Sequence, residues 1–268
     1  MMARVEIAEH VAALQRDGDL LAVAAERAGL EAKVPSCPSW QVKDLLRHIS
    51  YVHRWAAGYV VEQRTERLRG RPSETELLQG GPPDAELLDW FRAGHRALVD
   101  ALATADPAMQ CWTFLAAPSP LAFWARRQAH ETAIHRVDAE LAGGDASPFP
   151  PKFAADGIDE LIMGFFGRDG AELSPEQRAG LRSLQVEATD VGAAWWLELT
   201  ADGMLAANVG RGVSAAKSGS AQCTVAGPAP DLYLLLWNRA QPATVGLRVS
   251  GDYAVLESWR NGMRVTWQ

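Results

Sequence analysis

Residues 126–144 read RRQAHETAIHRVDAELAGG and are the most informative stretch of the chain. We expect a helix over residues 121–142, ended by the pair of glycines that follows it. Glu131 and His135 are four residues apart, a spacing that places both side chains on one face of a helix. A carboxylate and an imidazole arranged in this way can bind the same divalent metal ion.

The spacing differs from that of the zinc motif HExxH, in which two histidines four residues apart bind the metal and the glutamate acts as a base. His130 and His135 are five residues apart, which corresponds to roughly 140° around a helix. We therefore expect Glu131 and His135, rather than the two histidines, to share an ion.

A third ligand must come from another helix, and His48 in DLLRHISYVHR (residues 44–54) is the best candidate. Asp44 lies one turn before it and could orient its ring, as Asp138 could orient the ring of His135. The spacing alone leaves a second interpretation open, because a buried Glu–His pair can also be a hydrogen-bonded feature of the core.

The other histidines are not assigned to the metal site in the first place. His95 lies on an apolar stripe, and we interpret it as a core histidine, with pocket wall or fourth ligand as alternatives. His53 is expected to face solvent or a loop, and His10 is expected to be exposed.

Four stretches of about 20 residues have helical periodicity, which is typical of a four-helix bundle. Gly18 lies on the apolar face of the first stretch, where it would allow the close approach of a neighbour. Ser39 is a plausible N-cap for the second stretch. A shorter helix is expected over residues 153–167. The four long stretches span about 7–28, 42–59, 84–105 and 121–142.

After residue 180 the pattern changes to short strand-like runs with one helical run, APDLYLLLWNRA (residues 229–240), which indicates a small α+β domain. The predicted fold class is α+β, with a bundle domain over residues 1–168 and a smaller domain over residues 181–268. The expected strands span 183–189, 193–200, 222–227, 245–251 and 262–267.

The composition excludes several classes of protein. Apolar residues make up 48% of the 268 residues and the net charge is −7, which argues against a disordered chain and against a nucleic-acid-binding protein. No apolar run is long enough to cross a bilayer, and the N-terminus lacks the features of a secretory signal. Three scattered cysteines fit a reducing compartment. We therefore expect a cytoplasmic protein without nucleic-acid or membrane partners.

Four stretches of the chain have sequences typical of one known family. The stretches are CPSWQVKDLLRHISYVHRWAAGYV (37–60), RRQAHETAIHRVDAELAGG (126–144), APDLYLLLWNR (229–239) and LRVSGD (247–252). Together they resemble the mycothiol-dependent maleylpyruvate isomerase family. The resemblance implies a DinB-like four-helix bundle followed by a small α/β domain distantly similar to sterol carrier proteins. It also implies one divalent metal ion, commonly zinc, bound by His48, Glu131 and His135.

The resemblance further implies mycothiol, a thiol of actinobacteria, as co-substrate. Three protein ligands leave open positions on zinc, which favours thiolates and lowers the pKa of a thiol that binds it. The activated sulfur would attack a small electrophile, either as a cis–trans isomerase or as a thiol S-transferase. Arg239 is the candidate to stabilise the developing negative charge, with Arg248 as the second choice. A monomer or homodimer is expected.

Two other functions remain open at this stage. The chain could be a non-enzymatic carrier that holds an apolar ligand in its C-terminal domain, or an iron- and oxygen-dependent thiol enzyme on a DinB-like bundle.

Overall fold

The computed structural model forms two compact units, one comprising residues 6–147 and the other residues 148–266. The division falls after residue 147 rather than at the expected boundary of residue 168. Helix α6 (Pro151–Asp159) packs against helix α8 (Ala229–Leu236), and this contact explains the difference. The structure describes residues 5–68, 70, 73–144, 146–166, 176, 179–200, 205–211 and 221–262.

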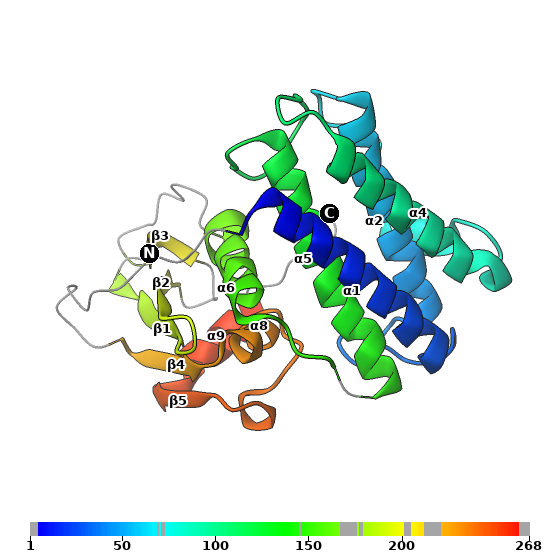
Figure 1. Cartoon of the computed structure of the whole chain (residues 1–268). Coiled ribbons are helices and arrows are strands. Elements are labelled where there is room, and N and C mark those ends of the chain that lie inside the picture. Colours follow the sequence, from blue (N-terminus) through cyan, green and yellow to red (C-terminus); the bar gives the residue numbers. More distant parts are fainter. Residues whose placement is uncertain are drawn as a thin grey trace. The chain divides into compact units, whose positions relative to one another are not determined.

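The first unit is a four-helix bundle, as predicted, made of helices α1, α2, α4 and α5 (Figure 1). Helix α1 packs against α4 and α5, and α2 packs against the same two helices, so that α1 and α2 lie diagonally across the bundle. The four helices span Ile7–Ala28, Val42–Glu62, Leu87–Thr104 and Pro120–Gly143.

The helix ends follow ordinary capping chemistry, with one departure from the prediction. Helix α2 has Gln41 as its N-cap, not Ser39, and the Asp44 carboxylate accepts a hydrogen bond of 2.8 Å from the Gln41 backbone N–H. Helix α5 begins as its sequence suggests, because the Ser119 hydroxyl accepts from the backbone N–H of Ala122 and proline occupies the first turn.

A short helix, α3 (Glu74–Gln79), capped by Ser73, lies between the second and third predicted helical stretches. The third stretch, predicted over residues 84–105, begins with the 3-10 helix η1 (Asp84–Glu86), which leads into α4. Ser73 followed three residues later by glutamate is a capping box, so the signal for α3 was present in the sequence.

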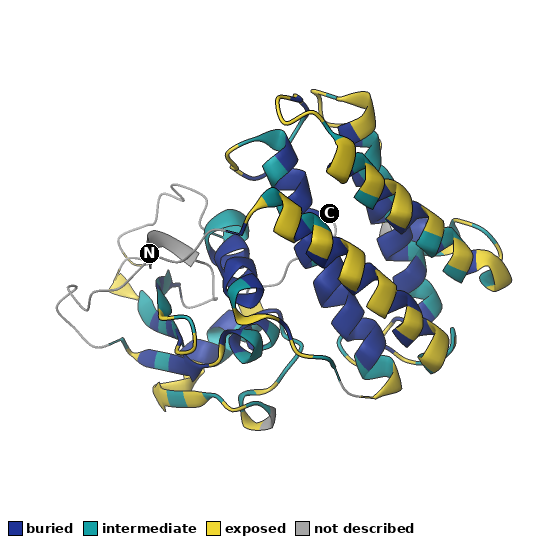
Figure 2. Ribbon diagram, viewed as in Figure 1, coloured by how far each residue is buried: buried dark blue, intermediate teal, exposed yellow. Residues whose placement is uncertain are grey.

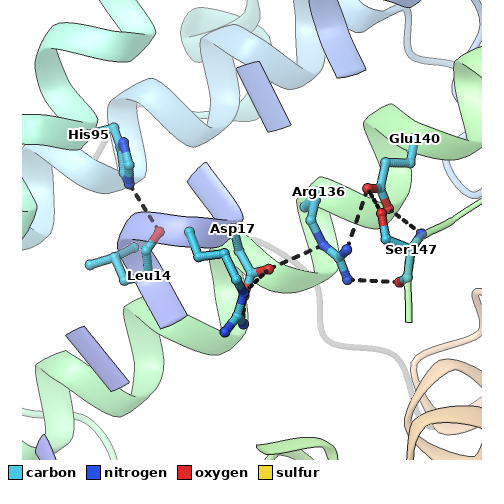
Figure 3. A network of polar contacts seen from close by, with 7 residues as sticks. Leu14, Asp17, His95, Arg136, Glu140 and Ser147 are labelled. Carbon is cyan, nitrogen blue, oxygen red and sulfur yellow. Dashed lines mark hydrogen bonds and ion pairs between the residues drawn. The ribbon is translucent and has the colours of Figure 1, made fainter. Parts of the chain in front are cut away.

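Helix α5 is the most deeply buried helix of the bundle, and its polar side chains are therefore buried with it (Figure 2). Arg136 links α5 to α1, because its Nε lies 3.3 Å from the Asp17 Oδ1 atom, and both side chains are 1% exposed. Its guanidinium also donates to the backbone oxygen of Ser147 and pairs with Glu140 (Figure 3). These contacts place one buried cation beside two buried carboxylates.

Gly18 provides the close approach that its position on the apolar face suggested. A Cβ atom added at Gly18 would lie 2.2 Å from the Nε2 atom of His95. His95 cannot easily move away, because its Nε2 is bonded to the backbone oxygen of Leu14 at 3.0 Å (Figure 3) and its ring stacks on Phe91.

Replacement of Gly18 by alanine should therefore destabilise the bundle. The overlap with His95 outweighs the better helix propensity of alanine, and we expect a net loss of about 1–3 kcal/mol, measured as a lower Tm in thermal unfolding followed by circular dichroism.

Gly58→Ala is the matched control, because a Cβ at Gly58 in α2 would meet only a glutamate oxygen at 4.0 Å. That variant should gain about 0.5–1 kcal/mol from helix propensity. Equal effects of the two substitutions would contradict the packing explanation.

The second unit contains a five-stranded sheet in the order β3-β2-β1-β4-β5 (Figure 1). Neighbouring strands are antiparallel except β1 and β4, which are parallel. Burial alternates along β1, where Leu184, Val186 and Ala188 are buried. The strands span Arg182–Ala188, Ala193–Leu199, Leu205–Arg211, Cys223–Gly227 and Arg248–Gly251.

Helices α8 and α9 (Tyr253–Gly262) both pack against β1 and β4, while α6 continues into a π-helical stretch, Glu160–Phe166. The predicted α+β class is confirmed, and four expected strands are present as β1, β2, β4 and β5. Strand β3 and helix α9 were not predicted. The strand expected over residues 262–267 lies outside the described residues, except for Gly262, which ends α9.

Candidate metal centre

Three side chains from two helices meet inside the bundle. The Nε2 atoms of His48 and His135 lie 3.6 and 3.5 Å from the same oxygen, Oε1 of Glu131. Their ligand atoms all lie within 4.8 Å of one another. The residues that the sequence singled out as a possible metal site are therefore close together in space.

The packing of α2 against α5 explains why these residues meet. The Tyr59 and Trp124 rings stack at 5.2 Å, while His48 lies beside His135, so the two helices run in opposite directions. An antiparallel neighbour presents one imidazole to the Glu131 and His135 pair that lies one turn apart on α5.

The donor geometry fits a small divalent cation. Ligand atoms about 2.1 Å from a tetrahedral zinc ion are about 3.4 Å apart from one another. The two nitrogen–oxygen separations, 3.6 and 3.5 Å, are close to that value. Two imidazole nitrogens and one carboxylate oxygen are also a donor set that zinc and iron(II) accept.

Arg127 fixes the Glu131 carboxylate from one turn earlier on α5. Its Nη2 atom lies 3.0 Å from Oε2 of Glu131, and its side chain is 2% exposed. Burial alone would raise the pKa of the Glu131 carboxyl. Interactions with the two imidazoles and with the Arg127 charge outweigh burial and hold that pKa well below its usual range.

Asp138 orients His135, as the sequence predicted. Its Oδ2 atom is 2.8 Å from Nδ1 of His135, which leaves Nε2 directed toward Glu131. The other oxygen of Asp138 accepts a hydrogen bond from the Ser36 hydroxyl. Burial lowers the pKa of His135, but the bonds to Asp138 and Glu131 outweigh it and raise that pKa to about 9.

The loop before α2 covers one side of the cluster. It is closed by a backbone hydrogen bond of 3.1 Å from Val34 to Trp40, and it carries Ser36 as well. The Trp40 ring lies 5.0 Å from the His48 ring and 6.4 Å from the His135 ring. Trp40 therefore packs against both imidazoles.

The predicted burial of the other histidines agrees with the structure for His95 but not for His10 and His53. His95 is a buried core residue, as predicted. The expectation that His10 and His53 face solvent was wrong, because both are buried. The Nε2 atom of His53 is 2.8 Å from the Thr132 hydroxyl, and burial followed by the charge of His95 lowers its pKa well below the usual value.

Two functional residues were missed or misassigned from the sequence. Arg127 was not singled out, although its spacing of four residues before Glu131 was a usable signal. Asp44, expected to orient His48, accepts the N-cap hydrogen bond of α2.

Arg239 and Arg248 belong to the second unit, so their roles stay predictions. Arg239 follows α8, and its Nη1 donates a hydrogen bond of 2.8 Å to the backbone oxygen of Trp237. Arg248 is exposed on β5.

The fold and the donor set define a helical-bundle protein with a candidate metal centre and a small α+β unit. Two family models match the chain: the mycothiol maleylpyruvate isomerase N-terminal domain over residues 11–140, and the C-terminal domain of the same family over residues 152–258. Together they span most of the sequence. The chain belongs to the mycothiol-dependent maleylpyruvate isomerase family.

Solved structures support the same fold. The crystal structure of the mycothiol-dependent maleylpyruvate isomerase is similar with a TM-score of 0.60 and 13% identity, over 92% of this chain and 93% of that chain. A histidine-to-alanine mutant of that isomerase is similar with a TM-score of 0.61 and 12% identity over the same shares. No curated protein matches the sequence. The prediction of an enzyme is confirmed at the level of the family.

No helix in the part of the chain that the structure describes has both the length and the apolar character to span a membrane.

The raised pKa of His135 predicts that zinc binding depends on pH. A metal ion must displace the proton from His135, so the apparent affinity should fall about tenfold for each pH unit below about 9. Competition with a chromophoric chelator at several pH values measures this dependence. The same affinity at pH 6 and pH 8 would contradict the prediction.

Asp138→Asn should move this dependence to lower pH. The substitution removes the carboxylate that raises the pKa of His135, so the proton competes less strongly with the metal. The same chelator assay tests the shift, and an unchanged pH profile would show that Asp138 does not set the protonation of His135.

Proposed function

We propose that this chain is a metal-dependent enzyme that uses mycothiol to attack a small electrophilic substrate, with His48, Glu131 and His135 as the metal ligands. One observation carries the proposal: two imidazole nitrogens surround a single carboxylate oxygen at 3.6 and 3.5 Å. The family to which the chain belongs supports mycothiol as the thiol. Zinc is the metal we expect.

Each residue of the cluster has a role that follows from its contacts. A bound divalent ion would lower the pKa of a thiol that coordinates it, so that a thiolate forms at neutral pH. His48 and His135 would supply neutral nitrogen ligands, and Glu131 one anionic oxygen. Asp138 fixes which nitrogen of His135 faces the ion.

The chemistry of the thiol accounts for both activities considered. Its sulfur forms a bond to an electrophilic carbon of a cis double bond, and the electron pair moves onto the conjugated carbonyl oxygen. Rotation about the resulting single bond and elimination of the same thiol give the trans isomer. If the adduct gains a proton instead of eliminating the thiol, the enzyme is an S-transferase.

A thiol supplied by a co-substrate fits the protein's own cysteines. Cys111 and Cys223 are buried free thiols, and burial raises the pKa of both. A raised pKa makes a cysteine a poor nucleophile at neutral pH. Free thiols and a low-molecular-weight thiol cofactor also fit a cytoplasmic location.

Arg239 remains our candidate for binding the negative charge that develops on the substrate, and Arg248 the second choice. A guanidinium suits a carboxylate or an enolate oxygen because it donates two parallel hydrogen bonds. Substitution of Arg239 by methionine should lower kcat/KM without changing the metal content.

The iron- and oxygen-dependent enzyme is the second candidate function. Two histidines and one carboxylate are also the ligand set of non-haem iron(II) oxygenases. The two functions differ in one measurement, since the iron enzyme would consume oxygen in step with product. The carrier hypothesis is weaker, because the polar cluster on α2 and α5 has no use in an apolar carrier.

Loss of metal ligands should abolish both metal binding and activity. His48→Ala and Glu131→Gln each remove one of three ligands, so purified variants should hold far less zinc than the wild type by elemental analysis. Incubation with mycothiol and a cis-configured electrophile such as maleylpyruvate, followed by mass spectrometry of products and adducts, should give no conversion.

Two control variants separate this result from general damage. His53→Gln replaces a buried histidine that is not one of the three ligands and whose Nε2 atom lies 2.8 Å from the Thr132 hydroxyl, so this variant should keep the metal. Cys37→Ser removes the half-buried thiol of the loop before α2 and should keep the activity. Wild-type protein that holds no metal and forms neither product nor adduct would contradict the proposed function.

A further inference from the structure

We infer that Arg127 is a positioning residue that restricts Glu131 to binding the metal through one oxygen. The inference rests on the metal site of the proposed function. It adds to that function a reason why the site keeps room for a thiol.

The two oxygens of Glu131 face different partners. Oε1 lies 3.6 Å from the Nε2 atom of His48 and 3.5 Å from that of His135. Oε2 lies 3.0 Å from Nη2 of Arg127. One oxygen therefore points to the position that the imidazoles share, while the other is held in a charge-assisted hydrogen bond.

Arg127 is well placed to hold this oxygen. It lies one helical turn before Glu131 on the same face of α5, and its side chain is 2% exposed, so little water reaches the guanidinium to compete for its N–H groups. If Oε2 turned toward the metal, it would leave a buried guanidinium without this bond, and that loss is costly.

The number of carboxylate oxygens on the metal decides how much of the ion is left for substrate. With one oxygen from Glu131, the protein supplies three ligand atoms and a four-coordinate ion keeps one position open. With two oxygens, the carboxylate would fill that position. Arg127 thus determines whether a thiol can bind without displacing a protein ligand.

Cobalt(II) offers a direct readout, because four-coordinate cobalt absorbs visible light strongly and ions of higher coordination number absorb weakly. We would record the spectra of the cobalt-loaded wild type, Arg127→Gln and Arg127→Lys, with zinc affinity measured by chelator competition. Arg92→Gln is the control, since Arg92 of α4 also pairs with a carboxylate, that of Glu26 on α1, at 2.9 Å.

The inference predicts that Arg127→Gln weakens the visible bands and lowers zinc affinity about 10–100-fold, while Arg92→Gln keeps both. Arg127→Lys keeps the positive charge but lacks the planar guanidinium. In this variant the visible bands and the zinc affinity should both fall, but by less than in Arg127→Gln. This variant decides the question if the glutamine variant does not fold.

Two outcomes would contradict the inference, and only the second of them also contradicts the proposed function. A folded Arg127 variant with the spectrum and affinity of the wild type shows that the arginine does not control the coordination, and the proposed function stands. A wild-type protein that binds neither cobalt nor zinc removes the metal site itself, and with it both the proposed function and the inference.

Discussion

The negative charge of Glu131 is the constraint around which the bundle interior is organised. A carboxylate in such a largely buried position is tolerated only when cations or hydrogen-bond donors compensate it. Arg127 compensates one oxygen at 3.0 Å, and the imidazoles of His48 and His135 approach the other. The partners keep the carboxyl ionised, as its low pKa reflects. A cation at the meeting point of these donors would complete the compensation.

Helix α5 makes this arrangement possible because it is held firmly on both sides. Against α1, the buried pair of Arg136 and Asp17 fixes its position along the bundle. Against α2, the stacked Tyr59 and Trp124 rings set the distance between the helix axes. A metal site needs its ligands within a fraction of an ångström, and packed neighbouring helices provide that precision better than loops do.

The sequence predicted much of this structure because helical periodicity and the spacing of four residues are local signals. The four long helices and the pairing of Asp138 with His135 followed from such spacing. The predictions that were wrong or missing concern features that depend on tertiary contacts. His10 and His53 are buried although their positions along the helices indicated solvent. Strand β3 pairs with β2, and Val209 is the one residue of its sequence LAANVGR with a strong preference for strands.

The central claim is that one metal ion lies between His48, Glu131 and His135. A crystal grown with zinc and measured at the zinc absorption edge tests it most directly, because the anomalous signal locates the ion independently of any assignment. We predict a single strong peak about 2.1 Å from the Nε2 atoms of both histidines and from one oxygen of Glu131. A peak bound elsewhere, or none at this position in zinc-soaked crystals of active protein, would contradict the account.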